Sequence, residues 1–307
     1  MKKILGILMI VSLGVLATTI DSSKLEKKDN VWYNTTKNVP FTGIAKGYYK
    51  DGNIRTEVSF KDGKMSGISK GYYTNGKLRS EGNFENDKKI GTWKHYYENS
   101  TIQMLEEYDG NKCVIKEYYS NGMILRESNV DGEKLSGPYR EYYENGKLKS
   151  EFAYVNDMVE GLEIKYYEDG KKKSEYAYSK DMRNGKGVEY HKNGKVSIET
   201  NYKNDAKDGL YKEYYENGNL LGEVNFENNK KNSTFKQYYD DGKLWLEATF
   251  KDDLREGVMK EYHKNGKIKV ECTFINDQLN GKAVEYSDDG KVLSSNEFKD
   301  DVPVINN

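Results

Sequence analysis

The stretch Glu141–Glu151, EYYENGKLKSE, decides the fold, because the chain repeats it from end to end. Counted from its turn glycine, Gly146, the pattern returns every 24 residues, except for one step of 22 residues between Ser100 and Gly122. Eleven copies result, and a fixed period of this kind is the signature of a repeat architecture. Ser100 takes the glycine position in the third copy, and the other copies have Gly52, Gly76, Gly122, Gly146, Gly170, Gly194, Gly218, Gly242, Gly266 and Gly290.

Each copy has the pattern of a β-hairpin. The residue before the turn glycine is Asn or Asp in every copy, which favours a two-residue type I′ turn with positive φ at both central residues. Position −4, counted from the turn glycine, is always Tyr, and position −3 is usually a second Tyr. Another glycine recurs at −9, where Cys113 and Ser233 are the exceptions. Glu at +5 and an aromatic residue at +8 complete the second strand. The sequence predicts an all-β, extended single-sheet solenoid of about eleven 24-residue β-hairpin repeats.

A two-residue turn also fixes the cross-strand register. It places Lys70 opposite Glu81 and Tyr73 opposite Leu78. Side chains alternate between the faces of a strand, so one face collects the −3 tyrosine, the +2 aliphatic residue and the +8 aromatic residue. The other face collects the −4 tyrosine, the Lys–Glu pair and the basic residue at +3. The same register predicts the pairs Arg140–Glu151, Lys212–Glu223, Lys260–Glu271 and Tyr143–Leu148.

The ends of the chain differ from the repeats. Residues 1–20 have two lysines, an apolar run at Ile4–Leu16 and small residues after it, the pattern of a secretory signal peptide. An uncleaved anchor helix is the alternative, because Ile4–Ile20 is 17 residues long and just reaches the lower limit for a membrane span. Residues 21–40, with Trp32 and Tyr33, are expected to cap the first repeat, and residues 41–301 form the array. Residues 302–307 are a tail. The irregular stretch at Thr101–Cys113 indicates a bend or a slightly different hairpin.

No catalytic or metal-binding constellation emerges from the pattern. His95, His191 and His263 lie in distant repeats, and the last two take the second-tyrosine position, which favours a packing role. A nucleophilic pair of His95 and Cys113 lacks an orienting partner and an oxyanion motif. Cys113 and Cys272 are six repeats apart, which predicts two free, buried thiols.

The segments between +8 and the next −9 glycine, such as 155–160 and 203–208, are expected to be six-residue loops. Each commonly contains Asn and Asp, which invites a calcium interpretation. Each offers too few oxygen ligands for a calcium cage, so turn chemistry is favoured. We expect no cofactor and no enzymatic activity.

The repeat G-x-x-K-x-Y-Y-x-N-G-K-L-x-S-E resembles the bacterial variant of the MORN repeat, a short hairpin repeat. The resemblance covers nearly the whole chain after the predicted signal peptide. It implies a hairpin array that serves as a scaffold, a dimer surface, a lipid-contact module or an accessory to an enzyme. Members of this variant are often described as antitoxin-like, which implies protein binding. The doubled tyrosine and the dense lysine depart from the eukaryotic pattern and put phosphoinositide binding in doubt.

The candidate binding strip is the −4 tyrosine row. These rings either stack on their neighbours and stiffen the sheet, or form a recognition surface flanked by charge, and both roles can hold at once. The row consists of Tyr48, Tyr72, Tyr96, Tyr118, Tyr142, Tyr166, Tyr190, Tyr214, Tyr238, Tyr262 and Tyr286.

These features together indicate an exported, non-enzymatic repeat protein in the periplasm, at the cell surface or secreted. Its expected role is protein binding or scaffolding. An antitoxin-like inhibitor, a membrane-surface module and a homodimer through the apolar face remain alternatives. The formal charge of −1 becomes −3 without Lys2 and Lys3, which argues against nucleic acid as a partner.

The export prediction concerns the N-terminus of the protein in its native host. The mature chain should begin between Ala17 and Ser23, because the small residues there suit a signal peptidase. Intact-mass measurement of the native protein checks this, and a retained 1–20 segment would contradict it.

Overall fold

The computed structural model of the chain describes residues 18–305, so most of the predicted signal peptide lies outside the described residues. The backbone divides into two compact units, of which unit 1 ends at Met123 and unit 2 begins at Ile124. The boundary falls in the hairpin that follows the 22-residue step. Within the described residues, no helix has the length and apolar character needed to cross a bilayer.

Unit 1 is a series of antiparallel strands that pair with their neighbours in chain order from β5 to β11. Every adjacent pair is a hairpin, so each of these strand pairings is local in the sequence. The strands are β5 (Gly43–Tyr48), β6 (Ile54–Lys61), β7 (Lys64–Tyr72), β8 (Leu78–Glu85), β9 (Lys88–Tyr96), β10 (Ile102–Asp109) and β11 (Lys112–Tyr118).

The residues before the first repeat have a different arrangement. Strand β1 (Thr19–Asp21) runs parallel to β5, and the 3-10 helix η1 (Ser22–Lys24) follows it. Strands β2 (Leu25–Lys28), β3 (Val31–Asn34) and β4 (Val39–Pro40) form a separate small sheet. Phe41, Ala45 and Phe60 are buried together, and Trp32 from β3 packs against them. The first hairpin therefore has a hydrophobic cluster that involves the segment before it.

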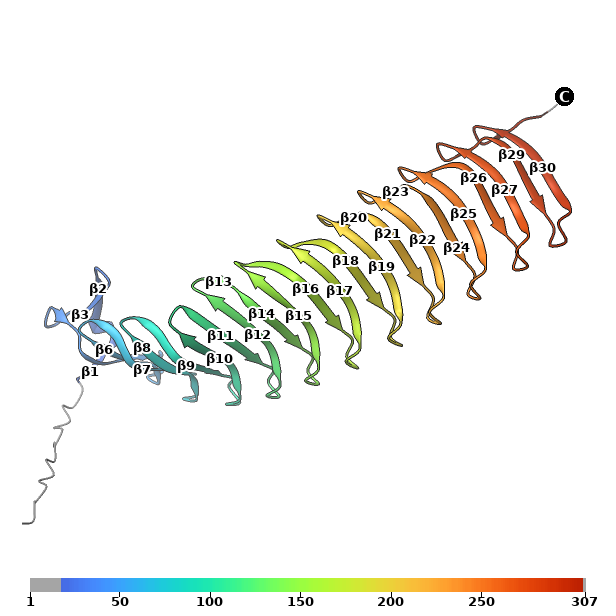
Figure 1. The fold of residues 1–307 in the computed structure, drawn as a ribbon. Helices are drawn as coiled ribbons and strands as arrows, with labels where there is room; N and C mark the ends of the chain where they lie inside the picture. The colour runs from blue at the N-terminus through green and yellow to red at the C-terminus, as the bar shows by residue number, and fades with distance from the viewer. Residues whose placement is uncertain (1–17, 306–307) are drawn as a thin grey trace, which may run out of the picture. The chain divides into compact units, whose positions relative to one another are not determined.

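Unit 2 continues the same scheme, and Figure 1 shows its hairpins lying side by side in chain order. The all-β hairpin-repeat prediction is confirmed. The strands are β12 (Ile124–Asp131), β13 (Lys134–Leu135), β14 (Gly137–Tyr142), β15 (Leu148–Val155), β16 (Met158–Tyr166), β17 (Lys172–Ser179), β18 (Met182–Tyr190), β19 (Val196–Lys203), β20 (Ala206–Lys207), β21 (Gly209–Tyr214), β22 (Leu220–Glu227), β23 (Lys230–Lys231), β24 (Thr234–Tyr238), β25 (Leu244–Lys251), β26 (Leu254–Tyr262), β27 (Ile268–Ile275), β28 (Gln278–Leu279), β29 (Gly281–Tyr286), β30 (Val292–Lys299) and β31 (Val302–Pro303).

The turn at the repeated glycine differs from the predicted type I′ turn. In the β14–β15 hairpin the Tyr143 N–H donates to the Lys147 carbonyl (2.8 Å), and the Gly146 N–H donates to the Tyr143 carbonyl (2.9 Å). Gly146 has a φ of 80°, whereas Asn145 is not among the residues with positive φ. This is a three-residue loop that ends in a G1 bulge, and only the glycine needs the left-handed conformation.

The Asn or Asp before the glycine is explained by its side chain. Asn145 Oδ1 accepts the Lys147 N–H at 2.9 Å, which is an Asx turn. The same bond, from the +1 N–H to the −1 side chain, recurs in all eleven copies. The sequence identified the right residues at the right place but for the wrong conformational reason.

A second bulge restores the predicted register beyond the turn. Tyr142 pairs with Leu148 and Glu141 with Ser150, so Lys149 is the bulge residue between these two pairs. The extra loop residue shifts the cross-strand register by one residue, and this bulge shifts it back. The Lys70–Glu81, Arg140–Glu151, Lys212–Glu223 and Lys260–Glu271 pairs are therefore confirmed.

The predicted pairs of Tyr73 with Leu78 and of Tyr143 with Leu148 are wrong, because the −4 tyrosine takes that place. The bulge exchanges the +2 and +3 side chains between the two faces. We call the Lys–Glu face the side with −8, −6, −4, +2, +5 and +7, and the aromatic face the side with −7, −5, −3, +3, +4, +6 and +8. Lys149 at +3 accordingly contacts Glu141 of the aromatic face at 2.7 Å.

The predicted six-residue loops at 155–160 and 203–208 are wrong as well. Strand β15 ends at Val155, its cross-strand partner Met158 begins β16, and only Asn156 and Asp157 connect them. Their φ values are 52° and 69°, so the type I′ turn lies here. Asp157 Oδ1 accepts the Leu135 N–H (2.7 Å) and the Asp157 N–H donates to the Leu135 carbonyl (2.9 Å). The acidic residue thus binds the neighbouring hairpin, which accounts for it without calcium.

The −9 glycine lies at a bulge that the 22-residue repeat lacks. Between β15 and β16 the register shifts by two residues after Glu151, and Gly161 there has a φ of 85°. Between β10 and β11 the register is regular, and Cys113 pairs with Tyr108. The two missing residues of that repeat are those that form the bulge, so the position no longer requires glycine.

The turn glycines should tolerate substitution poorly but locally. Gly146→Val forces a β-branched residue to a φ of 80°, with a strain of about 1–3 kcal/mol. Hydrogen exchange should rise in residues 135–175 and stay unchanged in residues 240–290, because a hairpin array responds through nearest neighbours.

Ser100 provides the matched control. It has a φ of 69° without being glycine, so Ser100→Gly should stabilise the protein or leave it unchanged. Loss of protection along the whole of unit 2 in Gly146→Val would instead indicate a single cooperative core.

Candidate binding surface

The predicted tyrosine strip lies on the Lys–Glu face, but its hydroxyl groups are used within the array. Tyr166 Oη donates to Glu151 Oε1 of the preceding hairpin at 2.7 Å. The same bond joins the −4 tyrosine to the preceding +5 glutamate in the pairs Tyr72–Glu57, Tyr96–Glu81, Tyr142–Glu127, Tyr190–Glu175, Tyr214–Glu199, Tyr238–Glu223 and Tyr262–Glu247. The +5 glutamate therefore connects two hairpins.

These bonds hold the tyrosines protonated. Burial and the hydrogen bond to Glu151 raise the pKa of Tyr166 to about 12, and burial and Glu57 do the same for Tyr72. Tyr48 in the first hairpin is 44% exposed and is the most open of the row. The hydroxyl groups of the row therefore join neighbouring hairpins. The tyrosines are partly exposed, and their binding role stays a prediction.

The second tyrosine bonds to the next hairpin. Tyr143 Oη donates to the Tyr166 carbonyl (2.7 Å), and Tyr73, Tyr167, Tyr215 and Tyr239 repeat the contact. His191 Nε2 lies 2.8 Å from the Tyr214 carbonyl, and His263 Nε2 lies 2.9 Å from the Tyr286 carbonyl. The predicted packing role of these two histidines is confirmed.

Ion pairs join the +5 glutamates to neighbouring basic side chains on the Lys–Glu face. Lys46 lies 2.7 Å from Glu57 and Lys186 lies 2.9 Å from Glu199. The hydrogen bond from Lys46 lowers the pKa of Glu57. Such exposed pairs contribute at most about 1 kcal/mol each to stability.

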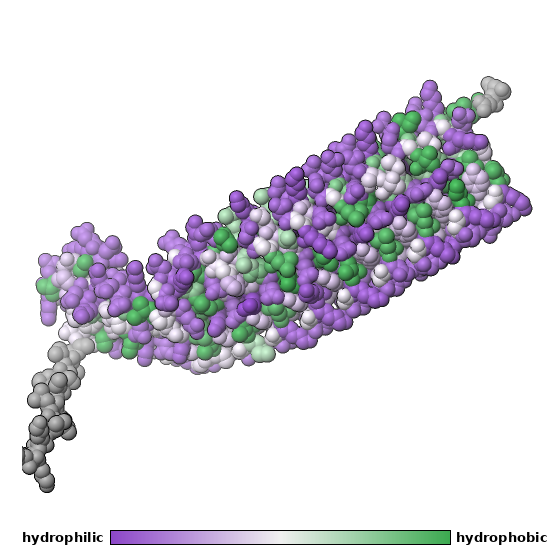
Figure 2. All heavy atoms as spheres, in the orientation of Figure 1, coloured by the Kyte–Doolittle hydropathy of each residue, from purple (hydrophilic) through white to green (hydrophobic). Residues whose placement is uncertain are grey.

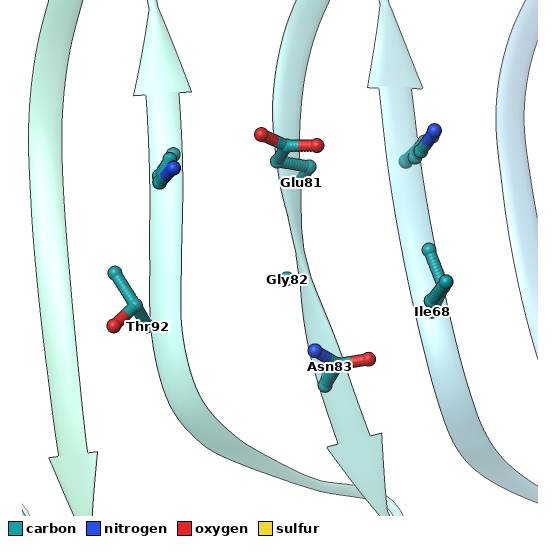
Figure 3. A pocket seen from close by; sticks show the side chains of 7 residues that line it. Ile68, Glu81, Gly82, Asn83 and Thr92 are labelled. Atoms are coloured by element: carbon teal, nitrogen blue, oxygen red, sulfur yellow. The ribbon is translucent and has the colours of Figure 1, made fainter.

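Two shallow hollows interrupt this face in unit 1. The first is about 420 Å³ and is lined by Ile68, Lys70, Glu81, Gly82, Asn83, Thr92 and Lys94. In Figure 3 the strand with Glu81, Gly82 and Asn83 runs between the strand with Ile68 and the strand with Thr92. The second, about 290 Å³, is formed by Thr19 and by the corresponding positions one repeat earlier.

The aromatic face covers its own rings. Val224, Ala248 and Cys272 at +6 are at most 4% exposed. Basic side chains lie over the neighbouring rings, with Arg255 3.8 Å and Arg183 4.2 Å from the ring centroids of Phe274 and Tyr202. Figure 2 shows hydrophobic residues interspersed with hydrophilic ones over the hairpins of unit 2. The predicted apolar face is thus partly covered by basic side chains.

A buried carboxylate in unit 1 escaped the sequence analysis. Glu106 of β10 is 8% exposed at the +6 position, where most other copies have an apolar, aromatic or small residue. Its Oε2 contacts Lys89 Nζ (2.7 Å) and His95 Nε2 (3.2 Å), and its Oε1 accepts the Tyr108 hydroxyl (3.2 Å). Burial opposes ionisation, but the bonds from His95 and Lys89 outweigh it and lower the pKa of Glu106 to about 2. The sequence signal for this site was a glutamate at the +6 position, where most other copies have an apolar, aromatic or small residue.

This cluster does not activate the cysteine beside it. Burial and the Glu106 charge raise the pKa of the Cys113 thiol, which disfavours the thiolate that nucleophilic chemistry needs. Cys113 and Cys272 are both free and buried, as predicted. Among residues 18–305, no group of three or more His, Cys, Asp or Glu side chains is arranged to hold a metal ion.

Glu106 should make unit 1 sensitive to acid. Its pKa is lower in the folded than in the unfolded state, so its stabilisation is present above about pH 4.5 and is lost as the pH falls toward 2. Glu106→Gln should remove roughly 2–3 kcal/mol at neutral pH and flatten this acid dependence. Unfolding curves between pH 2 and 7 check this. Glu107→Gln, on the opposite face, is the matched control, and an equal effect there would refute the assignment.

The sequence profile of the MORN repeat variant matches residues 41–62, 65–86, 89–109, 135–156, 159–180, 183–204, 207–228, 231–252 and 255–276, which are more than half of the chain. The copies around Gly122 and Gly290 fall outside these segments. No curated protein sequence matches the chain.

Solved structures show only distant similarity. The crystal structure of TcdB2-TccC3 is 11% identical over 83% of this chain and 18% of that chain, with a TM-score of 0.18. The Tc holotoxin pore of Photorhabdus luminescens is 9% identical over 87% of this chain and 17% of that chain, with a TM-score of 0.16. The chain spans less than a fifth of these structures, and similarity at this level carries no functional argument. The nine matched segments coincide with the observed hairpins, and the chain belongs to the MORN repeat variant family.

Proposed function

We propose that this chain is an exported, non-enzymatic repeat protein that binds a partner protein on its Lys–Glu face. The family is a non-catalytic binding repeat, which supports the class of function. The observation that carries the proposal is the Lys–Glu face itself. It offers basic, acidic and aromatic groups in one register on successive hairpins, next to aliphatic side chains that the array leaves exposed.

The exposed aliphatic residues at −8 argue for a partner. Ile68 is 57%, Leu162 51%, Leu210 42% and Val258 47% exposed. Each lies on the Lys–Glu face, two residues before position −6 in the same strand. Apolar positions on a face that also carries charged residues are typical of protein interfaces. The aromatic face offers less, because its rings are already covered by basic side chains.

Export is proposed on the sequence pattern of residues 1–20. The described fold begins close behind it, since the Thr18 carbonyl accepts the Ile44 N–H at 2.9 Å and Ile20 packs on the first hydrophobic cluster. A mature chain that begins at Thr18 or Thr19 would keep β1 whole. The raised pKa of Cys113 supports the absence of a thiol-based activity.

Partner capture with face-specific variants tests the proposal. The mature chain, used as bait in an extract of the exported compartment, should retain a partner that survives washing. Leu162→Arg, Leu210→Arg and Val258→Arg together should reduce its recovery at least about tenfold, because three arginines in the middle of the interface cost well over 1.4 kcal/mol in total.

Met158→Arg and Leu254→Arg supply the matched control. These side chains are 37% and 43% exposed and lie next to the type I′ turns, away from the middle of the face. Equal loss of the partner in both sets, or none in either, would contradict the assignment to the middle of the Lys–Glu face. Circular dichroism of each variant separates lost binding from lost folding.

A further inference from the structure

On the Lys–Glu face of unit 1 every hairpin has a lysine at the same position, and among the described residues most of these lysines form no ion pair. Position −6 is lysine in each of its hairpins, at Lys46, Lys70, Lys94 and Lys116. Lys46 forms an ion pair with Glu57. Within the part of the chain that the structure describes, no ion pair engages Lys70, Lys94 or Lys116. These three residues are half-buried and lie at the same position of successive hairpins.

The missing partners have two causes. Glu81 lies directly between Lys70 and Lys94, but its Oε1 accepts the Tyr96 hydroxyl at 2.8 Å. Leu105 lies directly between Lys94 and Lys116, where nine of the eleven repeats have glutamate at this position. Glu57, opposite Lys46 and Lys70, and Glu107, opposite Thr92 and Val114, are the other carboxylates in the middle of this face. In unit 1 the four lysines at −6 therefore outnumber the three glutamates Glu57, Glu81 and Glu107.

Unit 2 differs at the same positions. Three of its four −6 basic residues reach the +5 glutamates, with Arg140 3.7 Å from Glu151, Lys212 3.9 Å from Glu223 and Lys260 3.8 Å from Glu271. Ile164, Val188 and Val284 take the −6 position in the other three hairpins, while the glutamate persists from Glu127 to Glu271. Among the described residues, lysines without an ion pair on successive hairpins are thus found in unit 1.

Two lysines of this row line the hollows described above. Lys70 lines both of them, and Lys94 borders the larger one together with Asn83 and Thr92. These amide and hydroxyl groups can donate hydrogen bonds beside the ammonium groups. Ile68 supplies an exposed apolar wall between the two hollows. Glu81 lines the larger hollow and Glu57 the smaller one, and two lysines outnumber the single glutamate in each. A carboxylate flanked by an aliphatic side chain matches this lining.

We propose that the row Lys70, Lys94 and Lys116 binds an extended acidic polypeptide segment of a partner, laid across the strands. Neighbouring hairpins are two strand spacings apart, roughly 10 Å. A polyproline II segment has three residues per turn and rises about 3.1 Å per residue, so every third side chain returns to the same side after about 9 Å. The segment therefore carries Asp or Glu at every third position, with apolar residues between them that reach Ile68. This inference rests on the proposed protein-binding function and names the chemistry of the partner.

A defined peptide tests the proposal on the whole mature chain. A fluorescent peptide built of Glu-Ser-Ile triplets should bind in an anisotropy titration at low salt, and added salt should weaken the binding. A peptide of the same composition with its glutamates in one block should bind several-fold more weakly, because its charges do not match the hairpin spacing.

Two variants locate the site. Lys70→Gln, Lys94→Gln and Lys116→Gln combined should weaken binding at least roughly fivefold. Leu105→Glu should weaken it without removing a lysine, because the new carboxylate pairs with Lys94 and Lys116. The matched control is Lys212→Gln, Lys236→Gln and Lys260→Gln, the same positions in unit 2, which should leave binding unchanged.

Every outcome decides the proposal. Absence of peptide binding, equal binding of both peptides, or equal loss in the two lysine triples overturns it. Preferential binding of anionic vesicles or of a single-stranded oligonucleotide at these lysines overturns it in favour of another polyanion. A captured partner that tolerates the unit 1 triple would sink this inference alone and leave the proposed function standing.

Discussion

A hairpin in this chain has to bind its two neighbours because it has almost nothing else to bind. An isolated two-stranded hairpin is marginal in water, and the described hairpins of unit 2 form one sheet without a second layer. Backbone pairing is supplemented by three side-chain bonds per junction. The −4 tyrosine donates to the preceding glutamate, the −3 tyrosine to the next carbonyl, and the turn aspartate binds the adjacent turn. Each contributes about 1 kcal/mol, repeated along the unit.

This constraint determines which groups remain for function. The tyrosine hydroxyls and most glutamates are engaged in the junctions, so they are poor candidates for direct recognition despite their number. The −8 side chains and some −6 lysines make no junction bond, and these are the positions that vary between hairpins. Functional specificity in such an array is expected at positions the repeat does not need. Lys70, Lys94, Leu105 and Lys116 fit that description.

Departures from the repeat have local physical causes. The 22-residue step removes the two bulge residues, which leaves a regular β10–β11 ladder and frees the glycine position for Cys113. In the same region Glu106 replaces an apolar +6 residue and requires Lys89, His95 and Tyr108 to hold its charge in a buried place. Irregular copies in a periodic chain are thus the places where side chains take on new electrostatic roles.

The sequence by itself determined the hairpins, their number and the Lys–Glu pairs, because turn residues and a 24-residue period are local signals. It also located Asn145-Gly146 as a turn, although it assigned the two-residue geometry to the wrong end of the repeat. The sequence did not reveal the loop length, the bulge at Lys149 or the exchange of faces, which depend on backbone hydrogen bonds. The extra loop residue and the bulge compensate each other, so the cross-strand pairs beyond them are the same as for a two-residue turn. Only the tertiary structure decided how hydroxyls and carboxylates are shared between hairpins. That sharing joins residues 15 or 23 positions apart, as in Glu151–Tyr166 and Tyr143–Tyr166, and no local propensity encodes it.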